Sequence, residues 1–117
     1  MLAEAANEQG KTAEAEGYLN QVRTRAQVTP KTGLDQAGMR QAVIDERVLE
    51  LTGESHRFFD LVRWGLADDY MGATSLHGDH PKSLSNGQFR EGRDEYLWIP
   101  QSEIDANDNL KQNPGYE

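Results

Sequence analysis

The stretch DERVLELTGESHRFFDLVRW, Asp45 to Trp64, decides how this chain of 117 residues folds. Large apolar residues recur in it at helical spacing, and charged residues fall among them rather than on the opposite face. On a helix Arg47, Glu50 and Glu54 lie inside the apolar arc, so they must be buried with partners or line a cleft. Glu46, Glu50 and Glu54 also repeat every fourth residue, which is repulsive unless cations stand nearby.

Gly53 divides this stretch into two helices, and Ser55 is the expected N-cap of the second. We interpret the stretch as two helices packed at an angle, with a structural ion-pair network at their joint. The predicted network consists of Arg47, Glu50, Glu54, Arg57, Asp60 and Arg63, in which Arg47 and Arg57 bridge to the acids. Removing one partner of such a buried set costs ~3 to 5 kcal/mol, because the other charge is left desolvated.

His56 and Asp60 allow a second interpretation, a His/carboxylate pair for acid–base catalysis. The chain offers no nucleophile beside them, since it has no Cys and no G-x-S-x-G motif. Ion-pair networks commonly imitate active sites. We therefore predict a structural role for this pair, no catalytic residues and no enzymatic activity.

The composition limits the classes of partner. Twelve basic against 20 acidic residues give a net charge of −8, which argues against nucleic acid because phosphates require a basic surface. Neutral ligands, cations or a basic protein partner fit this balance. The absence of Cys excludes disulfides and thiolate zinc sites. No run of 18 apolar residues is present, so no membrane-spanning helix is expected.

Residues 1–27 are predicted to form a helical hairpin. Its first helix, 2–9, ends at Gly10, and Thr12 is the expected cap of a second helix that runs to about Ala26. The second helix carries one apolar stripe, formed by Ala15, Tyr18, Leu19, Val22 and Ala26. A hairpin of tetratricopeptide type and an ordinary helical hairpin are both compatible with this pattern, since no second copy follows.

The rest of the chain divides into three parts. Asp35 is predicted to cap the helix that opens the segment 35–71, which a long loop, 72–95, follows. In that loop His77, Asp79 and His80 could ligate a metal, but a solvated polar loop is the default and we predict no metal or other cofactor. The tail, 96–117, combines an extended stretch, 96–99, a single helical turn and Asx turns around Asn107.

Together these elements predict a mainly α fold in one domain, 1–117. It consists of a tetratricopeptide-like helical hairpin and packed helices, with a long loop and an irregular C-terminal tail.

Two separated motifs carry a family resemblance. The first is Glu46-Arg47-x-x-Glu50-Leu51 followed by His56-Arg57-Phe58-Phe59-Asp60-Leu61-x-Arg63-Trp64-Gly65, which resembles the signature near the C-terminus of SusD/RagB family proteins. The second runs from Ile99-Pro100-Gln101 to Asn113-Pro114-Gly115-Tyr116 and resembles the end of that family. The motifs occur in the family's order, behind a similar helical hairpin.

The resemblance implies a non-enzymatic function. Proteins of this family are outer-membrane nutrient-binding lipoproteins of the Bacteroidota that pass glycans or other oligomers to TonB-dependent transporters. It therefore implies a SusC-like transporter and an oligosaccharide, or another nutrient oligomer, as partners. The alternative is a tetratricopeptide-like scaffold that contacts the transporter and has no ligand site of its own.

Aromatic side chains are the expected ligand contacts, because sugar rings stack their apolar C–H faces on them. Tyr70 lies near the long loop and Phe89 lies within it, and these are the residues that we expect to be exposed for this purpose. The Trp64 of the signature is expected in the core.

The resemblance also implies a fragment. Family members are several times longer and begin with an export signal and a lipidated Cys, which this sequence does not contain. We expect the full-length parent at the cell surface in the outer membrane, and this C-terminal part to be soluble by itself. The stripe that contains Tyr18, Leu19 and Val22 would then be exposed and would promote self-association.

Overall fold

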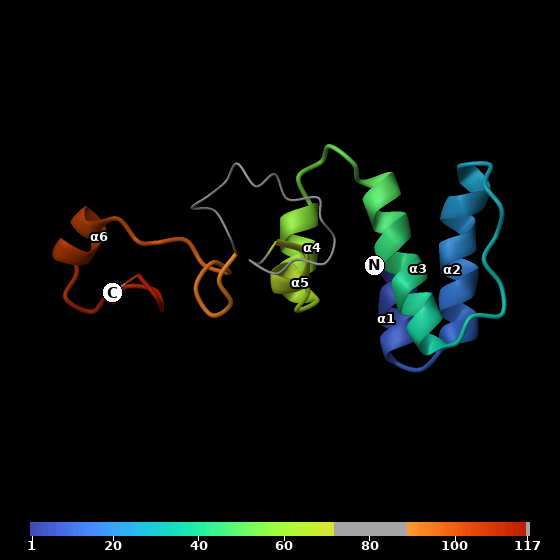
Figure 1. Cartoon of the computed structure of the whole chain (residues 1–117), viewed down its shortest axis with the longest axis horizontal. Coiled ribbons are helices and arrows are strands. Elements are labelled where there is room, and N and C mark those ends of the chain that lie inside the picture. The colour runs from blue at the N-terminus through green and yellow to red at the C-terminus, as the bar shows by residue number, and fades with distance from the viewer. Residues whose placement is uncertain (72–88, 117) are drawn as a thin grey trace. The chain divides into compact units, whose positions relative to one another are not determined.

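A computed structural model describes residues 1–71 and 89–116, in two compact units, residues 1–55 and 56–117 (Figure 1). The described residues contain six α-helices and no strand, which confirms the mainly α fold expected from the sequence. Within these ranges, no helix combines the length and apolar composition that crossing a bilayer requires. The unit boundary falls inside the stretch Asp45 to Trp64, directly after Ser55.

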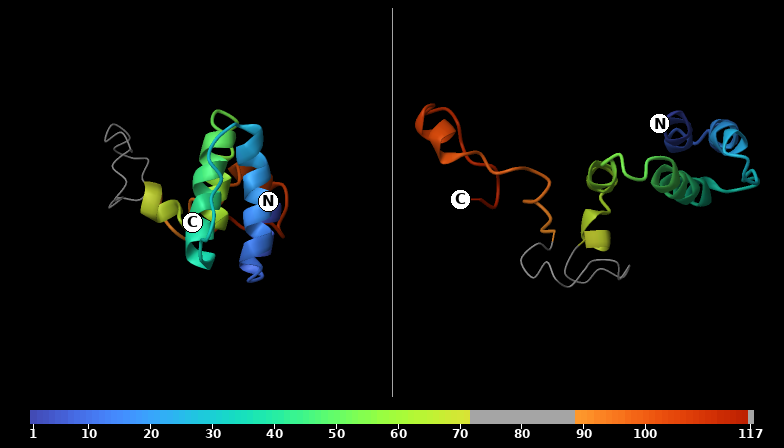
Figure 2. Two further views of the ribbon diagram at one scale, coloured as in Figure 1. Left: turned by 90° about the vertical axis from the view of Figure 1, so that its right-hand side faces the viewer. Right: turned by 90° about the horizontal axis from the view of Figure 1, so that it is seen from above.

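The first unit consists of three helices that lie side by side, α1 (Leu2–Glu8), α2 (Thr12–Arg25) and α3 (Gln36–Glu50) (Figure 2). Gly10 ends α1 at φ +76°, a left-handed conformation that favours glycine. The amide of Gly10 donates to the Asn7 carbonyl at 2.9 Å, and that of Lys11 to the Ala6 carbonyl at 2.9 Å. These are the two bonds of a Schellman motif, so the predicted end of the first helix is confirmed.

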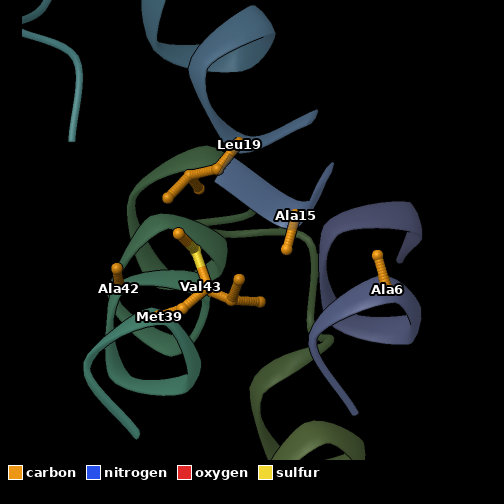
Figure 3. Packing of buried hydrophobic residues seen from close by; sticks show 6 residues of the cluster. All are labelled: Ala6, Ala15, Leu19, Met39, Ala42 and Val43. Atoms are coloured by element: carbon orange, nitrogen blue, oxygen red, sulfur yellow. The ribbon is translucent and has the colours of Figure 1, made fainter. Parts of the chain in front are cut away.

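All three helices contribute to one core (Figure 3). Ala15 and Met39 have no exposed surface, and Leu19 keeps 3% of its own. The members of this cluster are Ala6, Ala15, Leu19, Met39, Ala42 and Val43. The burial of Leu19 shows that the expected exposure of its stripe is wrong at this residue, because α1 and α3 cover it.

The helix caps agree with the sequence at one position and differ at two. Asp35 caps α3 as predicted, since its Oδ1 accepts from the Gly38 amide at 2.7 Å. Thr12 is not the cap of α2, because Lys11 precedes the helix and the Thr12 hydroxyl donates to Asn7 Oδ1 at 3.2 Å. Ser55 does not cap α4 either, since His56 occupies that position and its side chain makes no capping hydrogen bond.

The connection between α2 and α3 is fixed to α2 by polar side chains. The Asn20 amide nitrogen donates to the Lys31 carbonyl at 2.7 Å, while the Lys31 amide donates to Asn20 Oδ1 at 2.8 Å. Arg23 Nε donates to the Thr29 carbonyl at 2.8 Å, and the Gly33 amide donates to Glu16 Oε2 at 2.9 Å. Side chains of α2 thus satisfy several backbone groups of a connection that has neither helix nor strand.

The second unit contains α4 (Arg57–Arg63), α5 (Ala67–Met71) and α6 (Gln101–Asp105). Gly65, at φ +68°, ends α4 with the Schellman pattern seen at Gly10, since the Leu66 amide donates to the Leu61 carbonyl at 2.8 Å. The buried cluster of this unit consists of Leu61, Ala67 and Phe89.

The stretch 96–99 of the tail, for which the sequence predicts an extended backbone, forms neither helix nor strand and is bonded by a side-chain amide. The Ile99 amide donates to Gln112 Oε1 at 2.8 Å, and Gln112 Nε2 donates to the Ile99 carbonyl at 2.9 Å. The Asn109 amide donates to Asn107 Oδ1 at 3.1 Å, which confirms the Asx turn predicted around Asn107. Side-chain amides therefore take the place of a neighbouring strand.

Candidate functional site

A groove lies in the first unit. Its volume is about 340 Å³, and it lies between the start of α1, the second half of α2 and the second half of α3. Its lining consists of Met1, Leu2, Ala3, Tyr18, Leu19, Gln21, Val22, Val43, Glu46, Arg47, Glu50 and Leu51. Apolar side chains predominate in this lining, so the groove suits an apolar surface.

Two acids of the groove form ion pairs with arginines of α2. Arg23 Nη1 bonds Glu46 Oε2, and both side chains are largely buried, at 13% and 8% exposed. Arg25 Nη2 bonds Glu50 Oε2 in a more exposed pair. Glu46 and Glu50, which are four residues apart, thus have the nearby cations that the sequence requires. These cations come from α2 and not from the stretch that contains the acids. The sequence signal that could have revealed these partners is the presence of two arginines, Arg23 and Arg25, at the end of α2.

The remaining members of the predicted network are placed as follows. Asp60 is buried and accepts from Arg63 Nε at 2.9 Å, within α4. Arg47 lies beside Met1, with Nη1 3.5 Å from the Met1 sulfur. The predicted bridges that pass from residues 1–55 to residues 56–117 would join the two units and stay a prediction.

The proposed acid–base pair of His56 and Asp60 is placed at the start of α4. The backbone carbonyl of His56 accepts from the Asp60 amide at 3.0 Å, while the Asp60 carboxylate is engaged with Arg63. This arrangement stabilises the first turn of a short helix.

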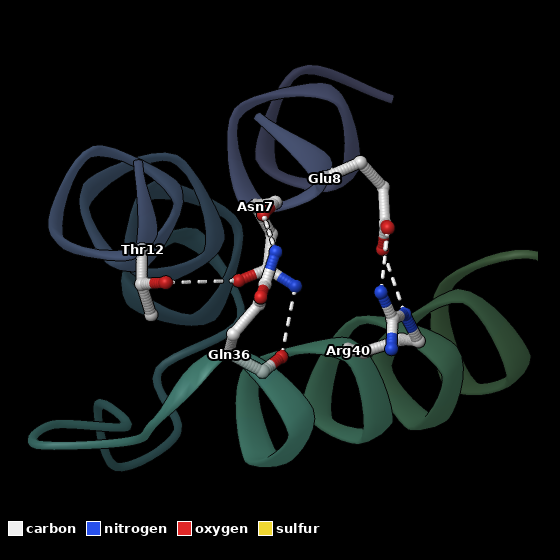
Figure 4. A network of polar contacts seen from close by, with 5 residues as sticks. All are labelled: Asn7, Glu8, Thr12, Gln36 and Arg40. Atoms are coloured by element: carbon white, nitrogen blue, oxygen red, sulfur yellow. Dashed lines mark hydrogen bonds and ion pairs between the residues drawn. The ribbon is translucent and has the colours of Figure 1, made fainter. Parts of the chain in front are cut away.

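A polar cluster that the sequence did not reveal connects α1 to α3 (Figure 4). Asn7 is 1% exposed, and its Nδ2 donates to the Gln36 carbonyl at 2.9 Å. Gln36 Nε2 in turn donates to the Asn7 carbonyl at 2.7 Å, and Thr12 donates to the Asn7 side chain. The sequence signal was an Asn that directly follows two alanines of the first helix.

Beside this cluster Glu8 and Arg40 form a two-point ion pair on the surface. Arg40 Nε and Nη2 donate to the two carboxylate oxygens of Glu8 at 2.7 and 2.6 Å. The hydrogen bonds from Arg40 lower the pKa of Glu8, and the same bonds raise the pKa of Arg40. Both groups are therefore held in their charged forms.

The two residues predicted to contact a ligand differ in exposure. Phe89 is buried at 7% exposed and packs against Leu61 and Ala67, so the expectation that it is exposed is wrong. Tyr70 is half-buried, and the Arg57 guanidinium lies 4.8 Å from the centre of its ring. The sequence pattern did not distinguish these two positions, because Tyr70 lies just before the predicted long loop, 72–95, and Phe89 lies within it.

Exposed aromatic residues are found instead on the stretch 96–99 of the tail. Trp98 and Tyr96 are 56% and 53% exposed, next to Leu97 at 85%. The stretch is fixed from one side, since the Tyr116 hydroxyl donates to the Tyr96 carbonyl at 3.1 Å and Asn113 Nδ2 donates to the Leu97 carbonyl. The pKa of Tyr116 is raised by burial and by the nearby Asp94 carboxylate.

Metal binding receives no support from the described part of the chain. Within residues 1–71 and 89–116, no three His, Asp or Glu side chains come together as a metal site. The loop candidates His77, Asp79 and His80 lie outside the described residues.

Comparison with known proteins gives matches along the whole chain. A sequence model described as the SusD family matches residues 1–116. SusD-like protein P2 of Formosa agariphila is 33% identical over 99% of this chain and 24% of its own length. The starch-binding protein SusD of Bacteroides thetaiotaomicron is 34% identical over 98% of this chain and 19% of its own.

A third relative matches a shorter segment more closely. SusD-like protein P25 of Formosa agariphila is 49% identical over 59% of this chain and 14% of its own length. This chain thus spans about a quarter or less of the length of these relatives, and no solved structure matches it. Because the family match covers residues 1–116, the resemblance seen in the two motifs is confirmed, and the chain belongs to the SusD family.

Proposed function

We propose that this chain is part of a nutrient-binding protein that takes up oligosaccharides together with a SusC-like TonB-dependent transporter. The observation that carries the proposal is the match to the starch-binding protein SusD over 98% of this chain. Family membership supports binding rather than catalysis. It also supports an outer-membrane, cell-surface location for a full-length lipoprotein of this kind.

The chemistry of the exposed aromatic residues supports a glycan ligand. A sugar ring presents apolar C–H faces to an aromatic side chain, while polar groups take its hydroxyls. Trp98 is more than half exposed and is mounted on a stretch whose backbone is fixed by Gln112 and Asn113. Tyr70 stays in the proposal as a second contact, whereas Phe89 is buried and is no longer proposed as one.

Tryptophan fluorescence tests the ligand site directly, because the chain has only two Trp residues. The variant Trp64→Phe leaves Trp98 as the sole reporter. Soluble starch, xylan and alginate oligosaccharides are titrated into this variant, and we expect at least one of them to change the Trp98 emission saturably. Trp98→Ala, with Trp64 as reporter, is the matched control and should lose the affinity for that oligosaccharide.

The second candidate function is an interaction scaffold that contacts the transporter without a ligand site. The groove among α1, α2 and α3 favours it, since tetratricopeptide-like helices bind partners through such surfaces. Retained binding to a detergent-solubilised SusC-like transporter, with no fluorescence response to any oligosaccharide, would favour the scaffold. A saturable response without transporter binding would favour the ligand site alone.

A further inference from the structure

A tight turn at residues 113–116 is bonded to the aromatic stretch 96–98 of the tail. The Tyr116 amide donates to the Asn113 carbonyl at 3.3 Å, which closes a four-residue turn with Pro114 and Gly115 at its two central positions. Gly115 has φ +79°, a value typical of the second central residue of a type II turn. Pro and Gly at these two positions favour the turn, so its conformation is set by its own sequence.

Two side chains of the turn hold the backbone of the stretch 96–98. Asn113 Nδ2 donates to the Leu97 carbonyl, and the Tyr116 hydroxyl donates to the Tyr96 carbonyl at 3.1 Å. The side chains of the stretch take no part in these bonds, and Trp98 keeps 56% of its surface exposed. The turn therefore fixes the backbone that carries Trp98 without covering its indole.

The turn itself packs on the side chain of Arg93. The Arg93 guanidinium carbon lies 4.2 Å from the centre of the Tyr116 ring, which is a cation–π contact. A Cβ at position 115 would lie 2.9 Å from both Cβ and Cγ of Arg93, a distance too short for any real Cβ contact. Gly115 thus meets two requirements, its positive φ and the close approach of Arg93.

From these contacts we infer that Gly115 and Tyr116 are positioning residues for the ligand contact of Trp98, an inference that rests on the function proposed above. On the other side of Trp98, Gln112 holds Ile99, so the backbone is fixed before and after the indole. A stretch that is ordered before the ligand arrives does not have to be ordered during binding. If the turn stayed docked in only about a tenth of the molecules, the apparent affinity would fall about tenfold.

The test uses the full chain with Trp64→Phe, in which Trp98 is the sole tryptophan. Starch, xylan and alginate oligosaccharides are titrated into this chain and into two variants of it. Gly115→Ala adds the Cβ that Arg93 obstructs, and Tyr116→Ala removes the ring and the hydroxyl. We expect each variant to raise the Kd for the bound oligosaccharide at least about fivefold. Each should also lower the fluorescence anisotropy of Trp98 without ligand.

Two controls separate positioning from a general loss of structure. Tyr116→Phe keeps the ring on Arg93 and loses only the hydroxyl bond, so its Kd should lie between those of the Trp64→Phe chain and Tyr116→Ala. Gly33→Ala places a similar backbone strain, at φ +70°, in the first unit, where its Cβ meets nothing within 4 Å. It should leave the Kd unchanged.

The outcomes distinguish this inference from the function on which it rests. Equal Kd values in the Trp64→Phe chain, Gly115→Ala and Tyr116→Ala would overturn the inference and leave the proposed function intact. A higher Kd with unchanged anisotropy would also overturn it, as would an equal loss of affinity in Gly33→Ala. No response of Trp98 to any of the oligosaccharides would contradict the proposed function, and the inference would fall with it.

Discussion

Residues 1–55 and residues 56–117 are ordered by different interactions. In the first unit three helices share one cluster of six buried apolar residues, and polar side chains fasten a long connection to α2. In the second unit the described residues bury only Leu61, Ala67 and Phe89 as an apolar cluster, and the tail depends on side-chain hydrogen bonds to its backbone. Apolar periodicity thus accounts for the first unit, and polar side chains account for much of the second.

The two units nevertheless share one device. A single side-chain amide makes two hydrogen bonds to the backbone of one distant residue, as Asn20 does with Lys31 and Gln112 does with Ile99. Such a pair reproduces the bonds of a strand without a strand. Such a pair lets a segment without apolar periodicity hold one conformation. A segment can therefore be ordered by hydrogen bonds without burying apolar side chains.

The largest expected effect comes from the core of the first unit. Met39→Ala should lower the free energy of unfolding of residues 1–55 by about 2–5 kcal/mol, because it opens a cavity at a site with no exposed surface. Urea unfolding followed through the amide NMR signals of α2 measures this. Leu49→Ala, on the exposed side of the same helix, is the control and should change stability by less than about 0.5 kcal/mol. Similar losses in both variants would contradict a core at Met39.

The two ion pairs between α2 and α3 should differ because their burial differs. Arg23→Met leaves the largely buried Glu46 carboxylate without its cation and should cost about 3 kcal/mol. Arg25→Met breaks an exposed pair and should cost less than about 1 kcal/mol. Thermal unfolding of both variants at the same ionic strength gives the comparison, and equal costs would show that burial of the first pair is unimportant.

In the second unit the hydrogen bonds of Gln112 should matter locally. Gln112→Ala removes both bonds to Ile99, and at about 1 kcal/mol each their loss should speed amide exchange at Ile99 about tenfold or more. Gln112→Glu keeps the acceptor for the Ile99 amide and loses the donor, so it should have a smaller effect. The urea midpoint of residues 1–55 should stay unchanged in both variants, and a shift there would contradict the separation of the units.

The smallest expected effect is a pH dependence at Glu8. Because Arg40 lowers the pKa of Glu8 below its ordinary value of 4.5, this pair stabilises the fold above pH 4.5 and loses that contribution as the pH falls through the lowered pKa. In Arg40→Gln an NMR titration should find the Glu8 pKa closer to 4.5 than in the unchanged chain. An unchanged pKa would mean that the two-point pair does not persist in solution.

The sequence by itself determined the helices, their approximate limits, the ends at Gly10 and Asp35, and the family. Helical periodicity and glycine at a left-handed position are local properties, since each depends on residues within a few positions of one another. The two family motifs are likewise contiguous strings of residues. These features were therefore accessible without any knowledge of contacts.

Only the tertiary structure decided which residues pair with one another. The partners of Glu46 and Glu50 come from α2, some 23 and 25 residues away, and Asn7 bonds Gln36 across 29 residues. The burial of Phe89 and the exposure of Trp98 are also products of packing. A charge pattern indicates that a charged residue requires a partner. The identity of that partner depends on which helix faces lie side by side, and the packing of the core determines those faces, whereas spacing along the chain does not.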